Sequence, residues 1–283
     1  MIYLDNCATT KPDKEVVEVM MKALTDDFAN PSSLHSFGHR VEKEIDVARK
    51  NAASLIGAQA EEIYFTSGGT ESNNIAVHGA IEKNKRRGKK IITSAIEHAS
   101  IDDQFKHYRE KGYEVVYLDV DESGSVDLEK FKEVMDEDTI LVSIIYVHNE
   151  LGTVNRVKEI FEIAKAINKD VFCHVDGVQA VGKIPVDVKD LGCHTFSFSS
   201  HKIYGPKGMG ALYKRKDVNI NSLVIGGGQE KGLRSGTENV PGILGFGKAC
   251  ELTKRDLDKR LAHAKEIKEY LLKKLEENLE DYK

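Results

Sequence analysis

The feature that most constrains the fold of this chain is a regular alternation between short apolar runs and longer segments with helical periodicity. The runs most typical of strands are residues 63–66, 89–93, 114–118, 139–147, 171–175 and 195–198. The run at 139–147 is strongly apolar, as expected for a strand that helices cover on both sides. Strands that alternate with helices at this spacing predict an α/β fold with a largely parallel sheet.

The helical periodicity is clearest at residues 36–56 and 157–167. A long and increasingly charged helix is predicted from residue 243 to about residue 279, with a break near residues 254–256. These segments are expected to cover the two faces of the sheet.

Composition and charge narrow the class of protein. The net charge of -5 gives no argument for a nucleic-acid partner, and no apolar run approaches the roughly 20 residues of a membrane helix. The N-terminus lacks the basic region and long apolar core of a signal peptide, so a cytoplasmic location is expected. The cysteines Cys7, Cys173, Cys193 and Cys250 are scattered without a CxxC pair, which indicates reduced thiols, and no metal site is expected.

Polar and ionisable side chains follow the predicted strands. Thr70, His98, Asn149, Asp176 and Lys202 each come shortly after a strand. Because ligands of α/β sheets gather at the carboxyl ends of the strands, these residues are expected to lie at one site.

Lys202 follows a run that alternates Phe with small hydroxyl residues, and it precedes a glycine-rich turn. A lysine at such a place can act as a Schiff-base nucleophile when burial or nearby positive charge lowers its pKa. A basic surface loop is the alternative. Residues 67–73 likewise follow a strand and open a helix, an arrangement that suits either a phosphate site or a plain turn.

Taken together, these residues are the set that pyridoxal 5'-phosphate (PLP) requires. Lys202 would hold the cofactor, and Asp176 would pair with its pyridinium nitrogen and keep it protonated. His98 could face the flat ring, and Asn149 and Gln179 could hydrogen-bond its hydroxyl group. The candidates for binding the phosphate are Gly69, Thr70, Ser199 and His201.

The chain resembles the cysteine desulfurases, the NifS/IscS-like group within the class V aminotransferase-type PLP enzymes. The matching motifs occur in the order of the family across nearly the whole chain, at residues 3–6, 30–33, 65–73, 97–98, 149–152, 174–176, 179, 197–208 and 228–242. The resemblance implies the type I PLP-dependent transferase fold, with a mostly parallel seven-stranded sheet, helices on both faces and a partial small domain.

The same resemblance implies a division into domains. Residues 1–15 would be the N-terminal segment of the small domain, and residues 16–245 would be the PLP-binding large domain. Residues 246–283 would be the first helical part of a truncated C-terminal small domain.

The resemblance further implies roles for individual residues. Lys202 would be the Schiff-base lysine and the base that moves the substrate α-proton, and His98 would stack on the ring and move protons. Asp176 would pair with the ring nitrogen, Gln179 with the ring hydroxyl, and Asn149 with cofactor and substrate. The implied phosphate ligands are Gly69, Thr70, Ser199, Ser200 and His201, together with Thr237 from the partner subunit of a homodimer.

The implied reaction converts L-cysteine to L-alanine. A cysteine thiolate takes the substrate sulfur as a protein persulfide and passes it to a sulfur-acceptor or scaffold protein for iron–sulfur cluster assembly. In the family this cysteine lies late in the small domain, beyond the position of Lys283, so impaired turnover is expected of this chain. An apolar face is also expected to lie uncovered on the sheet and on the last helix.

Other interpretations stay open at this point. Cys7 stands where relatives usually have a small residue, and its position fits either a thiol role or a small-residue substitution. A related PLP enzyme, such as a selenocysteine lyase or an aminotransferase, would not always need the thiol. The third hypothesis is a non-catalytic scaffold that uses an inherited PLP fold.

Overall fold

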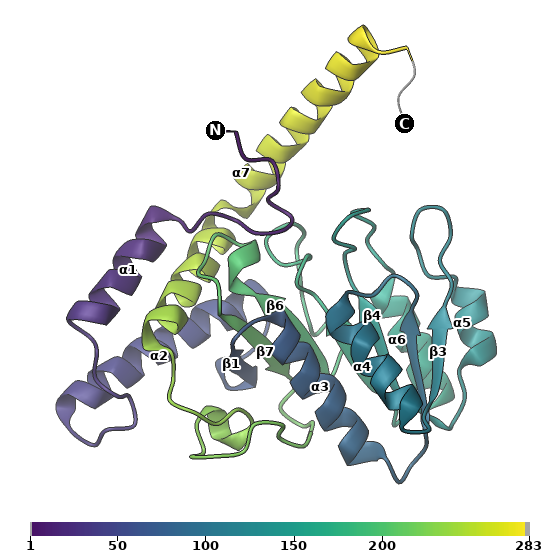
Figure 1. The fold of residues 1–283 in the computed structure, drawn as a ribbon, viewed down its shortest axis with the longest axis horizontal. Coiled ribbons are helices and arrows are strands. Elements are labelled where there is room, and N and C mark those ends of the chain that lie inside the picture. The colour runs from purple at the N-terminus through teal and green to yellow at the C-terminus, as the bar shows by residue number, and fades with distance from the viewer. Residues whose placement is uncertain (1, 281–283) are drawn as a thin grey trace.

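The computed structural model describes residues 2–280 and places seven strands in one sheet between two layers of helices (Figure 1). The strands are β1 (Ile63–Thr66), β2 (Lys90–Ser94), β3 (Glu114–Leu118), β4 (Thr139–Ile145), β5 (Phe172–Asp176), β6 (Thr195–Ser199) and β7 (Gly210–Lys214). Their order in the sheet is β1-β7-β6-β5-β4-β2-β3. Strand β7 runs antiparallel to β1 and β6, and the other pairs are parallel. The predicted α/β fold with a mostly parallel seven-stranded sheet is thereby confirmed.

The helices predicted at residues 36–56, 157–167 and 243 to about 279 are present, with ends close to those expected. The α-helices are α1 (Lys14–Thr25), α2 (Ser36–Leu55), α3 (Gly69–Asn84), α4 (Ala99–Glu110), α5 (Leu128–Val134), α6 (Val157–Ile167) and α7 (Val240–Asn278). The predicted break near residues 254–256 is wrong, because α7 continues through it without interruption. After Gly247 the sequence of α7 contains neither Gly nor Pro and is rich in good helix formers, so nothing interrupts its backbone hydrogen bonds.

The alternating residues of β6 show how the two faces of the sheet differ. Phe196 and Phe198 are fully buried, and the Phe198 ring lies 5.5 Å from the ring of Phe246 in α7. The small hydroxyl side chains of the same strand point to the other face, where α3 lies, because successive side chains of a strand alternate between faces. Thr195, for example, contacts His174, which in turn contacts Asn73 of α3. Small residues on that face leave room for a polar network between α3 and the sheet.

Helix α7 changes character along its length. As far as Thr253 it contributes buried residues to the core that it shares with α1 and α2. Its later part projects away from the sheet (Figure 1), and Ile267, Tyr270 and Leu271 are more than half exposed there. The expected uncovered apolar face therefore lies on the helix. The strands of the sheet are buried apart from the edge strand β3 and Lys214 at the end of β7, so the expectation of an uncovered sheet face is wrong. Helices α1, α2 and the first turns of α7 fill that side.

The domain boundary predicted at residues 245 and 246 falls inside α7, and the division into domains stays a prediction. Within residues 2–280, no helix combines the length and the apolar character that crossing a membrane requires.

The packing of α7 on the sheet gives a first test. Phe246→Ala is expected to lower the free energy of unfolding by about 3–5 kcal/mol, because it empties a fully buried site against Phe65 and Phe198. Urea denaturation followed by circular dichroism measures the change. Tyr270→Ala is the matched control on the projecting part of the same helix, with an expected effect within about 0.5 kcal/mol. Equal losses in the two variants would contradict this assignment of the core.

Candidate active site

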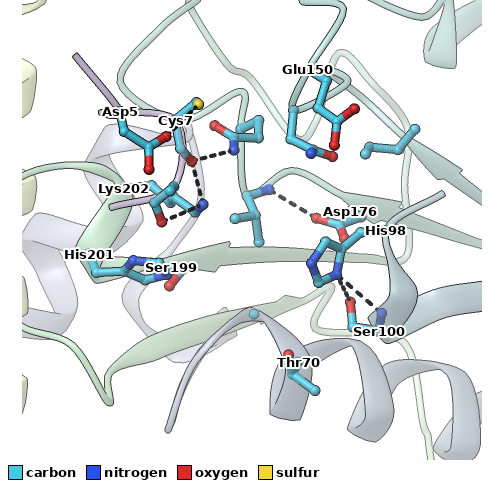
Figure 2. Close-up of a pocket in the computed structure, with 16 residues that line it drawn as sticks. Asp5, Cys7, Thr70, His98, Ser100, Glu150, Asp176, Ser199, His201 and Lys202 are labelled. Atoms are coloured by element: carbon cyan, nitrogen blue, oxygen red, sulfur yellow. Dashed lines mark hydrogen bonds between the residues drawn. The ribbon is translucent and has the colours of Figure 1, made fainter. Parts of the chain in front are cut away.

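A cavity of about 590 Å³ lies at the carboxyl ends of the parallel strands. Its lining includes every residue predicted for the site except Ser200 and Thr237 (Figure 2). Asp5, Cys7, Ser100 and Glu150 also line it. Within residues 2–280, no group of three His, Cys, Asp or Glu side chains is arranged to hold a metal ion.

The predicted residues reach this cavity from several strands. Gly69 and Thr70 open α3 after β1, and His98 is the N-cap of α4 after β2. Asn149 lies in the loop after β4. Asp176 is the last residue of β5, and Lys202 ends a short 3-10 turn directly after β6. These ends meet because the strands run parallel and their connecting helices lie on the faces of the sheet.

Asp176 is the most buried ionisable group of the cavity wall, with 3% of its surface exposed. The amide of Asn73 donates to its Oδ2 over 2.8 Å, and the backbone N–H of Val178 donates to its Oδ1 over 3.1 Å. Burial raises the pKa of Asp176, and these two hydrogen bonds oppose the rise. A carboxylate in such a place needs a cationic or hydrogen-bonding partner, and a protonated ring nitrogen would supply one.

A continuous chain of hydrogen bonds joins Asp176 to His98. The Asn73 amide nitrogen donates to Asp176 and also to the Ser100 hydroxyl, which lies 2.9 Å from Nδ1 of His98. The backbone N–H of Ser100 donates to the same Nδ1 over 3.1 Å. In its neutral form the His98 ring therefore carries its proton on Nε2.

Behind this chain, His174 fixes the orientation of Asn73. Nε2 of His174 lies 3.1 Å from Oδ1 of Asn73, and Nδ1 lies 2.8 Å from the Thr195 hydroxyl. Burial lowers the pKa of His174 to about 3, so the ring is neutral at physiological pH. It donates through Nε2 and accepts at Nδ1, which leaves the amide nitrogen of Asn73 facing Asp176.

Lys202 is half-buried, and its Nζ donates to the backbone carbonyl of Ala8 over 2.9 Å and to that of Cys7 over 2.5 Å. Burial lowers its pKa, and the neighbouring acidic groups oppose this shift. Gln179 donates through Nε2 to the same Cys7 carbonyl over 2.9 Å. Two nitrogen donors of the cavity thus converge on one oxygen atom (Figure 2).

The N-terminal segment reaches Lys202 because it pairs with the residues around that lysine. Thr10 donates through its backbone to His201 over 2.8 Å, and Asp13 donates to Tyr204 over 2.9 Å. These bonds hold Cys7 at the cavity wall, where it is exposed. The other three cysteines are buried, as packing residues are.

The part of the cavity beside His201 and the start of α3 offers a hydroxyl group without a partner in the described part of the chain. Ser199 is buried, and its hydroxyl has no hydrogen-bond partner among the described residues. The first turn of α3 contributes Gly69 and Thr70 beside it. Gly69 is required there, since a Cβ atom at this position would lie 2.6 Å from Cγ2 of Val178. A helix N-terminus with nearby hydroxyl groups suits an anion.

Two predicted residues lie elsewhere. Ser200 is fully buried away from the cavity lining and packs so closely on Gly205 that a Cβ there would lie 2.1 Å from its hydroxyl oxygen. Thr237 is exposed and lines a neighbouring pocket, in a loop that the ion pairs Arg234–Glu71 and Arg49–Glu230 hold in place. Its predicted role concerns a partner subunit and stays a prediction.

Sequence reasoning assigned no role to Asn73, Ser100, Glu97 or Lys183. Asn73 precedes Ala76, Val77 and Ala80 by helical spacing, so its place on the buried stripe of α3 could have been inferred from periodicity. The other three carry no such signal, because their partners lie far away in the sequence.

Glu97 gives a test of the electrostatics near the site. Its Oε1 accepts from the Ser94 hydroxyl and from the backbone N–H of Ile145, while Oε2 is buried without a partner among the described residues. Burial raises the pKa of Glu97 to about 8. The folded state therefore keeps a proton that the unfolded chain releases above its ordinary pKa near 4.5.

Glu97→Gln imitates the protonated carboxyl group and cannot ionise. Relative to this variant, the original protein is expected to lose unfolding free energy as the pH rises from about 5 to about 8, with no further relative loss above that range. Urea denaturation at a series of pH values measures the difference. A difference that is flat across the range would show that Glu97 is ionised in the folded protein.

Comparison with known proteins agrees with this arrangement. The aminotransferase class-V family model matches residues 2–283. The cysteine desulfurase IscS of Dictyoglomus turgidum is 45% identical over 280 residues, which are 99% of this chain and 71% of that protein. The cysteine desulfurase IscS of Methanosarcina thermophila is 48% identical over 257 residues, 91% of this chain and 63% of that protein.

Solved structures show the same likeness. A NifS-like protein superposes with a TM-score of 0.95 at 41% identity, covering 98% of this chain and 76% of that one. The structure titled SspA in complex with cysteine superposes with a TM-score of 0.85 at 38% identity, covering 89% of this chain and 72% of that one. The chain therefore belongs to the PLP-dependent class-V aminotransferase family and, within it, to the IscS- and NifS-like cysteine desulfurases.

Proposed function

We propose that this chain binds PLP in the cavity described above and acts on L-cysteine, producing L-alanine and a transferable sulfur atom for iron–sulfur cluster assembly. The observation that carries the proposal is that Lys202, Asp176 and His98 line one cavity at the strand ends. Membership of the cysteine desulfurase family supports the choice of substrate.

The residues present fit the cofactor. Asp176, with its carboxylate oriented by Asn73 and Val178, would hold the ring nitrogen in its protonated form. Gln179 would donate to the ring oxygen. Its amide nitrogen lies close to Lys202, because Gln179 Nε2 and Lys202 Nζ both donate to the carbonyl oxygen of Cys7. The unpartnered hydroxyl of Ser199, with His201 and the start of α3, would bind the phosphate. When bound, PLP supplies an electron sink for negative charge at the substrate α-carbon.

Lys202 would carry the cofactor and then serve as the base at the α-carbon. Its pKa is lowered by burial, so a larger share of its amine is neutral at physiological pH than for an exposed lysine. A neutral amine is the form that can attack a carbonyl carbon and accept a proton.

His98 and Asn149 would orient the reacting groups. The hydrogen bonds from Ser100 hold the His98 ring from behind, and its Nε2–H remains to donate within the cavity. Asn149 lines the same cavity and would contact both cofactor and substrate.

The sulfur step needs a thiolate that attacks Sγ of the bound cysteine. The Cβ–Sγ bond of the substrate breaks, an S–S bond forms on the attacking thiol, and a proton completes the methyl group of alanine. Burial raises the pKa of Cys173 to about 12, and Cys193 and Cys250 are buried as well. The thiol that attacks the substrate sulfur is therefore Cys7 or a thiol outside residues 2–280.

The proposal includes a homodimer in which Thr237 completes the phosphate site of the partner subunit. Thr237 is exposed, does not line the cavity of its own chain and lies in a loop fixed by two ion pairs. A rigid loop with an exposed hydroxyl suits a contact across a subunit interface.

Reductive trapping tests the cofactor assignment. After incubation with PLP, sodium borohydride is expected to fix the cofactor on the peptide that contains Lys202, as read by mass spectrometry. Lys202→Ala is expected to abolish the labelled peptide, while Lys189→Ala, at an exposed position outside the cavity, retains it. Label on another lysine of the unaltered protein would overturn the assignment.

Substrate identity is tested by product analysis. The protein loaded with PLP is expected to form L-alanine from L-cysteine in the presence of an added thiol acceptor, and Lys202→Ala is expected to form none above background. Alanine from L-selenocysteine alone would favour a selenocysteine lyase. Transfer of an amino group to an added keto acid, without alanine from cysteine, would favour an aminotransferase. Firm binding of PLP with no turnover of any of these substrates would favour a non-catalytic scaffold.

A further inference from the structure

Lys183 lies next to the site but has no part in the roles described so far. It ends the turn that follows β5, where its backbone N–H donates to Ala180 over 3.0 Å. Its Nζ donates to Oε1 of Gln179 over 2.6 Å. Gln179 in turn donates through Nε2 to the carbonyl oxygen of Cys7 at the cavity wall.

The direction of these bonds is set by the chemistry of the groups. An ammonium group donates hydrogen bonds and accepts none, so the amide oxygen of Gln179 must face Lys183. The amide nitrogen must then face the cavity. Without Lys183, only the hydrogen bond to the Cys7 carbonyl oxygen would favour this orientation of the Gln179 amide, whose two ends differ little in size.

The surroundings of Lys183 make it an unusual ammonium group. It is half-buried and forms no ion pair with a carboxylate among the described residues. Burial lowers its pKa to about 8, and the positive charge of Lys202 contributes to the shift. A desolvated cation beside a second cation is costly for the folded protein unless an anionic group comes close to it.

The turn that carries Lys183 is held rigidly against the segment that carries Lys202. Gly182 has a φ of +77°, and a Cβ atom there would lie 2.8 Å from a methyl carbon of Ile203. The spatial relation of Lys183, Gln179 and Lys202 is thus set by packing of the backbone.

We propose that Lys183 is a positioning residue that holds the side-chain amide of Gln179 with its NH₂ group toward the cavity, so that the site presents a donor to an anionic ring oxygen of the cofactor. This inference rests on the proposed binding of PLP. It adds the reason why Gln179 acts as a donor and not as an acceptor.

The test is a double-mutant cycle in the full chain. Lys183→Met removes the ammonium group and keeps most of the apolar stem, and Gln179→Ala removes the amide. Lys189→Met is the control on an exposed lysine nearby.

Dissociation constants for PLP come from equilibrium dialysis. Lys183→Met and Gln179→Ala are each expected to weaken binding roughly tenfold, the effect of losing one oriented hydrogen bond to a charged group. The double variant is expected to be no weaker than Gln179→Ala alone.

Spectroscopy gives a second readout that a purely structural role would not move. The visible absorbance of bound PLP changes with pH as its ring system gains or loses a proton. In Lys183→Met the midpoint of this change is expected to move to higher pH, since an anionic ring oxygen has lost an oriented donor. Lys183→Arg keeps a cationic donor and is expected to restore much of the original midpoint.

The outcomes separate the two proposals. If the unaltered protein does not retain PLP, the proposed function fails and this inference fails with it. If the unaltered protein retains PLP but Lys183→Met behaves like Lys189→Met, the inference alone is overturned. Additive effects of Lys183 and Gln179 would also overturn it, because Lys183 would then act independently of the amide. Urea midpoints check that each variant is folded, and Lys183→Leu, which also lacks a donor, replaces the methionine variant if that one is not.

Discussion

The site depends on one buried carboxylate, Asp176, at the end of the strand β5 in the interior of the sheet. Removing a carboxylate from water is costly, and the protein offsets part of that cost with two hydrogen bonds, from Asn73 and from the Val178 backbone. Both donors are themselves fixed, Asn73 by His174 and Val178 by its place in the turn. The carboxylate is therefore held in one orientation before any ligand arrives, and such preorganisation lowers the cost of binding.

This arrangement is possible because of the small side chains on one face of β6. Their hydroxyl groups face α3, while Phe196 and Phe198 fill the opposite face and pack toward α7. Bulky residues on both faces would separate α3 from the sheet and leave Asn73 out of reach of Asp176. The packing of the core on one side and the chemistry of the cavity on the other thus follow from the same alternation.

Much of the fold and many of the residues that line the candidate cavity could be predicted, because parallel strands bring their carboxyl ends to one edge. Thr70, His98, Asn149, Asp176 and Lys202 were expected at one site for that reason, and all of them line the cavity. Ser100 and Lys183 could not be predicted, since their partners are Asn73 and Gln179 and the contacts exist only after the elements pack. The break expected in α7 was wrong because a cluster of charges at a surface does not interrupt a helix that lacks Gly and Pro.

The sequence by itself determined the alternation of strands and helices, the parallel sheet and the residues that end its strands, because hydrophobic periodicity and turn residues act locally. Only the tertiary structure decided which of these residues share a cavity, that Ser200 lies outside it, and that the N-terminal segment lies against Lys202. It also decided the hydrogen-bond directions that run from Thr195 to His98. Those depend on contacts between residues as many as 101 positions apart in the sequence, which no local pattern specifies.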